Sequence, residues 1–140
     1  MKILLVEDNP ADARLVKEAL KEVRVKAELF WAQDGIEALD FLYRRGAHAD
    51  APVPDLILLD LNLPRLNGHE VLLQVKQDPA LLNIPIVMLS SSTAKQDVRD
   101  AYGAHANSFM TKPADFDKFM ALVKLIDAYW LSAATLPTHL

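Results

Sequence analysis

The chain has 140 residues, the length of one domain, and 51% of them are hydrophobic, enough to fill a single core. Its net charge is -4 with acidic and basic residues interspersed, so no basic surface predicts a nucleic-acid partner. Cysteine is absent, which excludes disulfides and thiolate chemistry, and no leader or apolar run of membrane length occurs, so we expect a cytoplasmic protein without a membrane partner.

Short apolar runs alternate along the chain with segments of helical spacing, the pattern of a repeated β/α unit. In chain order the predicted elements are strand 3–6, helix 10–23, strand 27–31, helix 35–45, strand 55–59, helix 69–78, strand 85–89, helix 94–102, strand 107–110 and helix 114–131. Short right-handed crossovers between five strands give an α/β fold, a doubly wound parallel sheet with helices on both faces. No linker or internal repeat divides the chain.

Several of these strands end in residues that can carry chemistry. Glu7 and Asp8 follow the first strand, Asp60 follows the third, Ser90 follows the fourth, and Lys112 comes shortly after the fifth. In an open parallel sheet, strand ends of one polarity lie along one edge. We therefore expect three carboxylates, a hydroxyl and an ammonium to meet in one crevice.

This set of side chains favours a divalent cation and a phosphoryl group. Converging carboxylates raise one another's pKa unless a cation compensates them. Oxygen ligands without His or Cys favour a hard ion, Mg²⁺ or Mn²⁺. An aspartate such as Asp60 is also a competent nucleophile toward phosphorus when a metal and an ammonium, here Lys112, neutralise the developing charge.

Over residues 2–131 the chain resembles a response-regulator receiver domain of two-component signalling. The matching marks are Val6-Glu7-Asp8, Asp60, Leu63-Pro64, Gly68, Ser90, Phe109 and Lys112-Pro113. Further segments are similar to stand-alone regulators paired with bacterial phytochrome histidine kinases: Asn9-Pro10-Ala11-Asp12, Phe41-Leu42-Tyr43-Arg44-Arg45-Gly46, Asp78-Pro79, Ala106-Asn107-Ser108-Phe109-Met110 and Trp130. The resemblance implies a flavodoxin-like (βα)5 fold with strand order 2-1-3-4-5.

The resemblance also implies a role for each site residue. Asp60 accepts a phosphoryl group from the histidine of a sensor kinase, which we expect to be a bacterial phytochrome. Asp8, Asp60 and the backbone carbonyl of Asn62 bind Mg²⁺, and Glu7 acts through water. Lys112 pairs with the acyl phosphate, and its bond to the following proline is commonly cis in the family.

The resemblance also implies a conformational switch and residues that set how long the phosphoryl group persists. Ser90 moves to the phosphoryl oxygen and Phe109 turns inward, so that the signal leaves through the fourth helix, fifth strand and fifth helix. Asn62 and Ser92 flank the path of attacking water and tune dephosphorylation, which the protein assists as it assists its own phosphorylation.

The last helix is apolar on more than one face. Its expected core face comprises Phe116, Phe119, Met120, Val123, Ile126 and Trp130. Leu122, Leu125 and Tyr129 form an adjoining apolar stripe, which we expect to be the interface of a homodimer. The alternative is that the tail, residues 132–140, folds back over the stripe.

The sequence therefore predicts a receiver domain at residues 1–131, a tail and no output domain. An aspartate-nucleophile phosphohydrolase is the alternative from another class, but the second residue after Asp60 is Asn62 rather than a second carboxylate, and no insertion forms a lid. A receiver that only binds partners would lack Asp60 or Lys112, and both are present.

Overall fold

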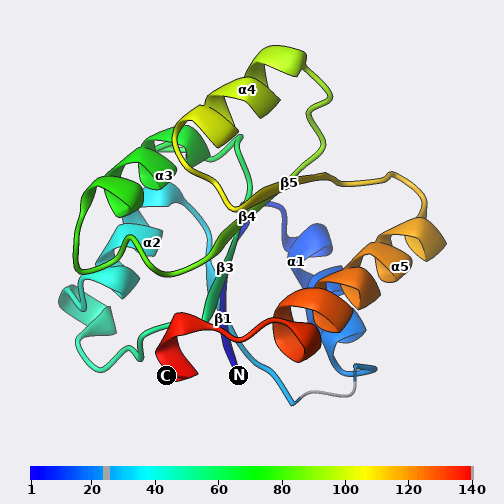
Figure 1. The fold of residues 1–140 in the computed structure, drawn as a ribbon, viewed down its shortest axis with the longest axis horizontal. Coiled ribbons are helices and arrows are strands. Elements are labelled where there is room, and N and C mark those ends of the chain that lie inside the picture. Colours follow the sequence, from blue (N-terminus) through cyan, green and yellow to red (C-terminus); the bar gives the residue numbers. More distant parts are fainter. Residues whose placement is uncertain (24–25, 140) are drawn as a thin grey trace.

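A single parallel sheet forms the centre of the molecule. The structure, a computed structural model, describes residues 1–23 and 26–139. The strands are β1 (Lys2–Val6), β2 (Glu28–Ala32), β3 (Leu56–Leu59), β4 (Ile86–Ser90) and β5 (Ser108–Thr111). Their order is β2-β1-β3-β4-β5 and every pairing is parallel. Figure 1 views this sheet nearly edge-on, with helices on both of its sides. The predicted fold class and strand order are confirmed, and each strand lies within one residue of its prediction.

Alternation along the strands divides the core into two layers. Leu4 and Val6 of β1 face one cluster of buried side chains, and Ile3 and Leu5 face the other. The central strands β3 and β4 alternate in the same way, and their residues are buried on both faces. Such continuous apolar strands are typical of a parallel sheet covered by helices on both sides.

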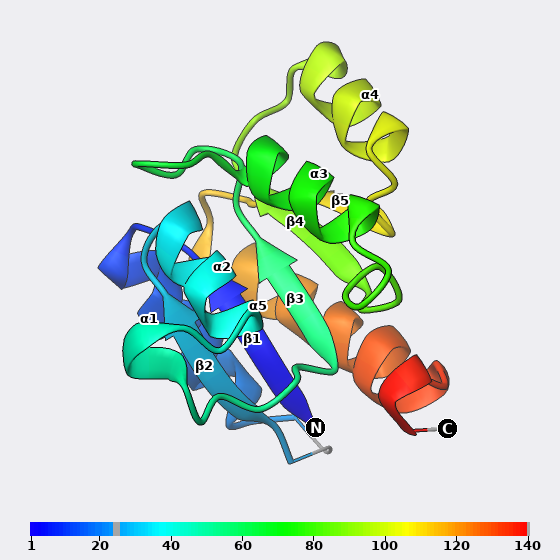
Figure 2. The ribbon, with the colours of Figure 1, turned by 90° about the vertical axis from the view of Figure 1, so that its left-hand side faces the viewer.

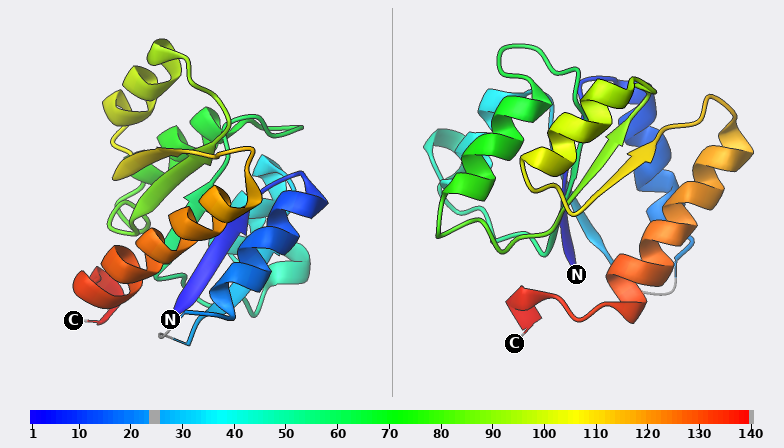
Figure 3. Two further views of the ribbon diagram at one scale, coloured as in Figure 1. Left: turned by 90° about the vertical axis from the view of Figure 1, so that its right-hand side faces the viewer. Right: turned by 45° about the horizontal axis from the view of Figure 1, so that its top comes forward.

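Five helices cover the sheet. They are α1 (Pro10–Leu20), α2 (Gly35–Leu42), α3 (Gly68–Gln77), α4 (Lys95–Gly103) and α5 (Phe116–Ile126). Helices α2, α3 and α4 lie on one face (Figure 2), whereas α1 and α5 lie together on the other (Figure 3). Within the described ranges, none of these helices has the length and apolarity needed to cross a bilayer.

Helix α2 is shorter than predicted because its end is closed by a turn that the apolar pattern does not reveal. Arg44 adopts a left-handed backbone with φ 56°. The Arg45 N–H donates to the Asp40 carbonyl at 2.8 Å and the Arg44 N–H donates to the Phe41 carbonyl at 3.2 Å. These two bonds form a Schellman motif, which terminates the helix at Leu42 instead of Arg45.

The last helix also departs from its predicted bounds. Asp115 caps it by accepting the backbone N–H of Lys118, so α5 begins at Phe116 rather than at 114. Beyond Ile126 the chain continues as a π-helical segment, Asp127–Ala133, two residues past the predicted end. Two short 3₁₀ turns complete the chain's regular structure, Gly46–His48 and Pro137–His139.

Gly68, at the start of α3, touches the backbone that carries Asp60. A Cβ atom at Gly68 would lie 2.0 Å from the Asp60 carbonyl oxygen and 2.8 Å from the Leu61 Cα. The Gly68 N–H also donates to the Leu61 carbonyl at 2.8 Å. The absence of a side chain therefore lets the β3–α3 loop fold tightly against the end of β3.

We predict that Gly68→Ala destabilises the protein by about 2 kcal/mol, because backbone must move to admit the methyl group. Gly103→Ala is the matched control: no atom lies within 4 Å of its added Cβ, and we expect it to be neutral or stabilising. Urea denaturation of both variants measures the difference. Equal stabilities of the two variants would contradict the close approach.

Candidate functional site

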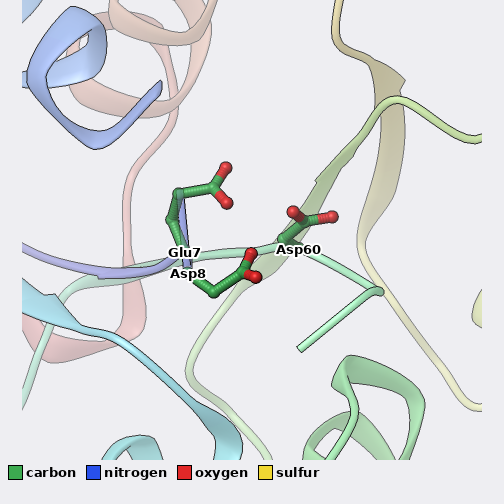
Figure 4. Close-up of side chains that lie close together, drawn as sticks. All are labelled: Glu7, Asp8 and Asp60. Atoms are coloured by element: carbon green, nitrogen blue, oxygen red, sulfur yellow. The ribbon is translucent and has the colours of Figure 1, made fainter. Parts of the chain in front are cut away.

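Three carboxylates converge at the carboxyl edge of the sheet. β1 and β3 are neighbours, with Val6 paired to Leu59, so Glu7 and Asp60 leave adjacent strands at the same level. One oxygen from each of Glu7, Asp8 and Asp60 lies within 4.8 Å of the other two (Figure 4). Glu7 and Asp60 are buried, whereas Asp8 is exposed. The predicted convergence of strand ends is thus present in the fold.

Lys112 brings the only ammonium described in this cluster. It follows β5, and its backbone N–H donates to the Ser90 carbonyl at 2.7 Å. Its Nζ donates to Glu7 Oε1 at 2.5 Å and to Asp60 Oδ2 at 3.3 Å. The side chain is only 7% exposed, so these ion pairs are formed away from bulk water. No cis peptide bond occurs among the described residues, and the implied cis Lys112–Pro113 bond is therefore wrong.

The charges of the cluster are not balanced. Burial raises the pKa of Glu7 to about 7, against the lowering effect of its hydrogen bond from Lys112 and with a further increase from the charge of Asp60. Burial alone would lower the pKa of Lys112, but hydrogen bonds to Asp12 and Glu7, and the charges of Asp60 and Glu7, hold it above its usual value. One lysine cannot neutralise all of these carboxylates.

The oxygen atoms of the cluster fit a hard divalent cation. Among residues 1–23 and 26–139, no hydrogen bond or ion pair engages the Asp8 carboxylate, so both of its oxygens are available. Both oxygens of Glu7 already accept hydrogen bonds: Oε1 accepts from Lys112 Nζ, and Oε2 accepts the N–H of Asn9 at 3.2 Å. Mg²⁺ and Mn²⁺ prefer such carboxylate sets and complete their shells with water or phosphate oxygen.

The loop that carries Asn62 is anchored to the neighbouring helix. Asn62 is exposed two residues after Asp60. Farther along this loop, Arg65 donates from Nε and Nη2 to the two carboxylate oxygens of Asp34 at 3.0 and 2.9 Å. Burial alone would raise the pKa of Asp34, but the hydrogen bonds from Arg65 and from the backbone of Glu37 lower it. The bidentate pair fixes the loop against the start of α2.

The two serines after β4 have different partners. Ser90 is fully buried at the end of β4, and its Oγ accepts the N–H of Ser92 at 3.2 Å. The Ser92 hydroxyl donates to Asp97 Oδ2 at 2.5 Å and accepts the N–H of Ala94 at 3.3 Å. Ser92 therefore orders the first turn of α4. Its predicted role in dephosphorylation, like that of Asn62, stays a prediction.

Phe109 lies on β5, next to α4. Its side chain is half-buried and packs against the core layer beneath α2, α3 and α4. Its backbone N–H donates to the hydroxyl of Tyr102 on α4 at 3.1 Å. Met88 of β4 is its partner in the sheet register. This position links β5 to α4 directly.

Sequence reasoning did not assign Asp12 to the site. It lies in the first turn of α1, where Asn9 caps the helix and Pro10 is the first helical residue. Asp12 Oδ2 accepts a hydrogen bond from Lys112 Nζ at 2.9 Å, closer than the Asp60 contact. The sequence contained a signal for this position. Asn9 and Pro10 mark the start of the helix, which puts the acidic side chain of Asp12 in its first turn, at the carboxyl edge of the sheet.

The predicted stripe on α5 is exposed for two of its three residues. Leu125 is 61% exposed and Tyr129, in the π-helical segment, is 58% exposed, whereas Leu122 is half-buried against the core. Of the predicted core face, Phe119, Val123 and Ile126 are buried, but Phe116 is 56% exposed, so its placement there is wrong. It is the first residue of the helix, at the edge of the packed layer.

The carboxyl-terminal tail does not cover this stripe. Leu136 is buried, and the Thr138 hydroxyl donates to Asp55 Oδ1 near the amino edge of the sheet. Leu125 and Tyr129 remain exposed beside it, so the alternative in which the tail folds over them is wrong. The last residue of the predicted tail, Leu140, lies outside the described residues.

Comparisons with known proteins agree with this geometry. The family model "Response regulator receiver domain" matches residues 3–124. Response regulator Rcp1 of Synechocystis sp. (strain ATCC 27184 / PCC 6803 / Kazusa) is 44% identical over 135 residues, covering 96% of this chain and 92% of that protein. The crystal structure of its Mn²⁺-bound form covers 97% of this chain and 98% of its own, with a TM-score of 0.94.

Two further solved structures are similar over the same length. The phosphorylated cyanobacterial phytochrome response regulator RcpA is 48% identical, with a TM-score of 0.94 and 97% of both chains covered. The bacteriophytochrome response regulator AtBRR is 40% identical, with a TM-score of 0.75, and covers 97% of this chain and 96% of its own. The acidic cluster of Glu7, Asp8 and Asp60 thus matches a fold in which a relative binds a divalent metal.

We predict that Asp8→Asn weakens Mg²⁺ binding by about tenfold or more, because it removes a direct ligand whose carboxylate has no other hydrogen bond or ion pair in the described part of the chain. Glu7→Gln should weaken it less, since Glu7 is held by Lys112 and Asn9. Titration with MgCl2, followed by tryptophan fluorescence, measures both variants. Trp31 is a suitable reporter because its Nε1 donates to the Glu7 carbonyl at 2.7 Å. Equal losses in the two variants would contradict the direct and water-mediated roles.

Proposed function

The chain belongs to the response regulator receiver domain family, and on that premise we propose that it accepts a phosphoryl group on Asp60 from a sensor histidine kinase. The observation that carries this proposal is the position of Asp60. Its carboxylate is 9% exposed, lies in the three-carboxylate cluster and is 3.3 Å from Lys112 Nζ.

In the proposed reaction a carboxylate oxygen of Asp60 attacks the phosphorus of a phosphohistidine. The new P–O bond forms as the P–N bond breaks, and the leaving imidazole takes up a proton. Lys112 neutralises charge on the acceptor and on the transferred group. A bound Mg²⁺ or Mn²⁺ would supply further positive charge to the phosphoryl oxygens, with Asp8, Asp60 and the Asn62 carbonyl as direct ligands and Glu7 acting through water.

The output of the reaction would be a change on the α4-β5-α5 surface. We infer that Ser90 moves to a phosphoryl oxygen and that Phe109 turns inward behind it. The buried hydroxyl at the end of β4 and the Phe109–Tyr102 bond between β5 and α4 support this path. The protein would also assist loss of the phosphoryl group, with Asn62 and Ser92 beside the attacking water.

We propose a bacterial phytochrome as the cognate kinase. The support is similarity to proteins described as phytochrome and bacteriophytochrome response regulators. On this proposal the chain acts in light signalling, in the cytoplasm. A receiver domain bounded at residues 1–131 likewise remains a prediction.

We predict that Asp60→Asn stays folded and gains no phosphoryl mass. The amide occupies the same space but is not a nucleophile toward phosphorus. Intact-mass measurement after incubation with Mg²⁺ and acetyl phosphate tests this, and the exposed Asp50→Asn is the matched control that should be labelled like wild type. Persistent Mg²⁺-dependent labelling of Asp60→Asn would move the acceptor elsewhere.

We further propose that the α5 stripe of Leu122, Leu125 and Tyr129 mediates a homodimer. Two large apolar side chains exposed side by side on one helical segment favour association with another apolar surface. A second copy of the same stripe would supply that surface through a two-fold axis. Because the stripe lies on the proposed output surface, phosphorylation is expected to tune the association.

We predict that Leu125→Glu weakens dimerisation by about a hundredfold, because two like charges would be desolvated at the axis. The core face of α5 is unaffected, so the variant should fold. Leu82→Glu, an exposed leucine between α3 and β4, is the matched control. Sedimentation of these proteins, with and without phosphorylation, decides the matter. A wild type that is monomeric in both states rules out this interface.

A further inference from the structure

All three N–H donors of Lys112 have partners in the unphosphorylated protein. Its ammonium carries three N–H bonds, and three carboxylates accept from it: Glu7 at 2.5 Å, Asp12 at 2.9 Å and Asp60 at 3.3 Å. An acyl phosphate on Asp60 can take over the N–H that Lys112 gives to Asp60, but a second hydrogen bond from Lys112 to the phosphoryl group requires that Glu7 or Asp12 give up its contact. Burial and solvent access decide which one.

Glu7 is poorly placed to lose its partner. Its side chain is 4% exposed, and only the N–H of Asn9 supports its other oxygen. Bulk water cannot hydrate a carboxylate at that depth, and a water-mediated contact with a bound cation does not replace the direct ion pair, so loss of the ammonium is strongly unfavourable. We therefore expect the Glu7–Lys112 contact to persist.

Asp12 is placed differently. Its side chain is 30% exposed, and it lines a hollow of about 200 Å³ together with Ser91, Lys112 and Pro113. Water can solvate the carboxylate there when the ammonium leaves, so the loss is small. Asp12 also lies outside the three-carboxylate cluster, so its separation from Lys112 leaves the ligands of a bound cation in place.

We propose that Asp12 is a positioning residue that holds Lys112 in the unphosphorylated protein and competes with the phosphoryl group for its ammonium. This inference rests on the proposed phosphorylation of Asp60. In the resting state Asp12 holds one N–H of Lys112 toward α1. When Asp60 carries a phosphoryl group, that N–H passes to a phosphoryl oxygen and Asp12 becomes hydrated.

The test is the affinity for beryllofluoride, a non-covalent phosphoryl analogue, titrated in the presence of Mg²⁺ and followed by tryptophan fluorescence. Asp12→Asn leaves a weaker, uncharged acceptor and should bind beryllofluoride about tenfold more tightly than wild type. Asp12→Glu, which restores the carboxylate, should stay within about twofold of wild type. Glu18→Gln removes the same charge from α1, where Glu18 pairs with Lys21 rather than with Lys112, and should have no effect.

A double-mutant cycle separates competition for Lys112 from a general effect of charge. In a Lys112→Met background, Asp12→Asn should change the affinity less than about twofold. If Lys112→Met binds beryllofluoride too weakly to measure, the rate at which acetyl phosphate labels Asp60 replaces the affinity in this cycle. Intact-mass measurement follows that rate in both backgrounds. The same enhancement in both backgrounds would overturn the proposal.

The remaining outcomes are also decisive. If wild type binds beryllofluoride and Asp12→Asn binds it no more tightly, the role of Asp12 is wrong and the function of Asp60 stands. If wild type neither binds beryllofluoride nor gains a phosphoryl group, both the proposed function and this inference fail.

Discussion

One buried ammonium surrounded by carboxylates is the interaction on which the site depends. Lys112 follows the edge strand β5 and donates to Glu7, Asp12 and Asp60. Each of these partners lies more than 50 residues away in the sequence. These contacts join the ends of β1, β3 and β5 with the first turn of α1. Without the lysine, buried like charges would repel one another at the edge of the sheet. With it, negative charge still exceeds positive charge, and the edge attracts a divalent cation.

The rest of the fold keeps this cluster compact. Parallel pairing brings the strand ends to one level, and Gly68 lets the loop after Asp60 return immediately to α3. Arg65 then ties that loop to Asp34 at the start of α2. Each of these contacts restrains the backbone near Asp60. Cation binding and phosphoryl transfer therefore require little further ordering of the chain there.

The two faces of α5 have different surroundings, and the tail covers neither Leu125 nor Tyr129. One face of α5 completes the core, while Leu125 and Tyr129 remain outside it. The tail instead packs at the opposite edge, where Thr138 binds Asp55. The outer face of α5 is thereby left open, while β5 and α4 contact each other through Phe109 and Tyr102.

The amino-acid sequence was enough to predict the five β/α units, the parallel sheet and the presence of Glu7, Asp8, Asp60 and Lys112 at strand ends. These follow from hydrophobic period and from the polarity of parallel strands, which are local properties of the chain. The folded structure was needed to identify the exact partners of Lys112, including Asp12, because side-chain contacts between residues about 100 positions apart leave no local pattern. It also decided the early end of α2 and the path of the tail. Those depend on a left-handed Arg44 and on a hydrogen bond to Asp55, neither of which apolar spacing encodes.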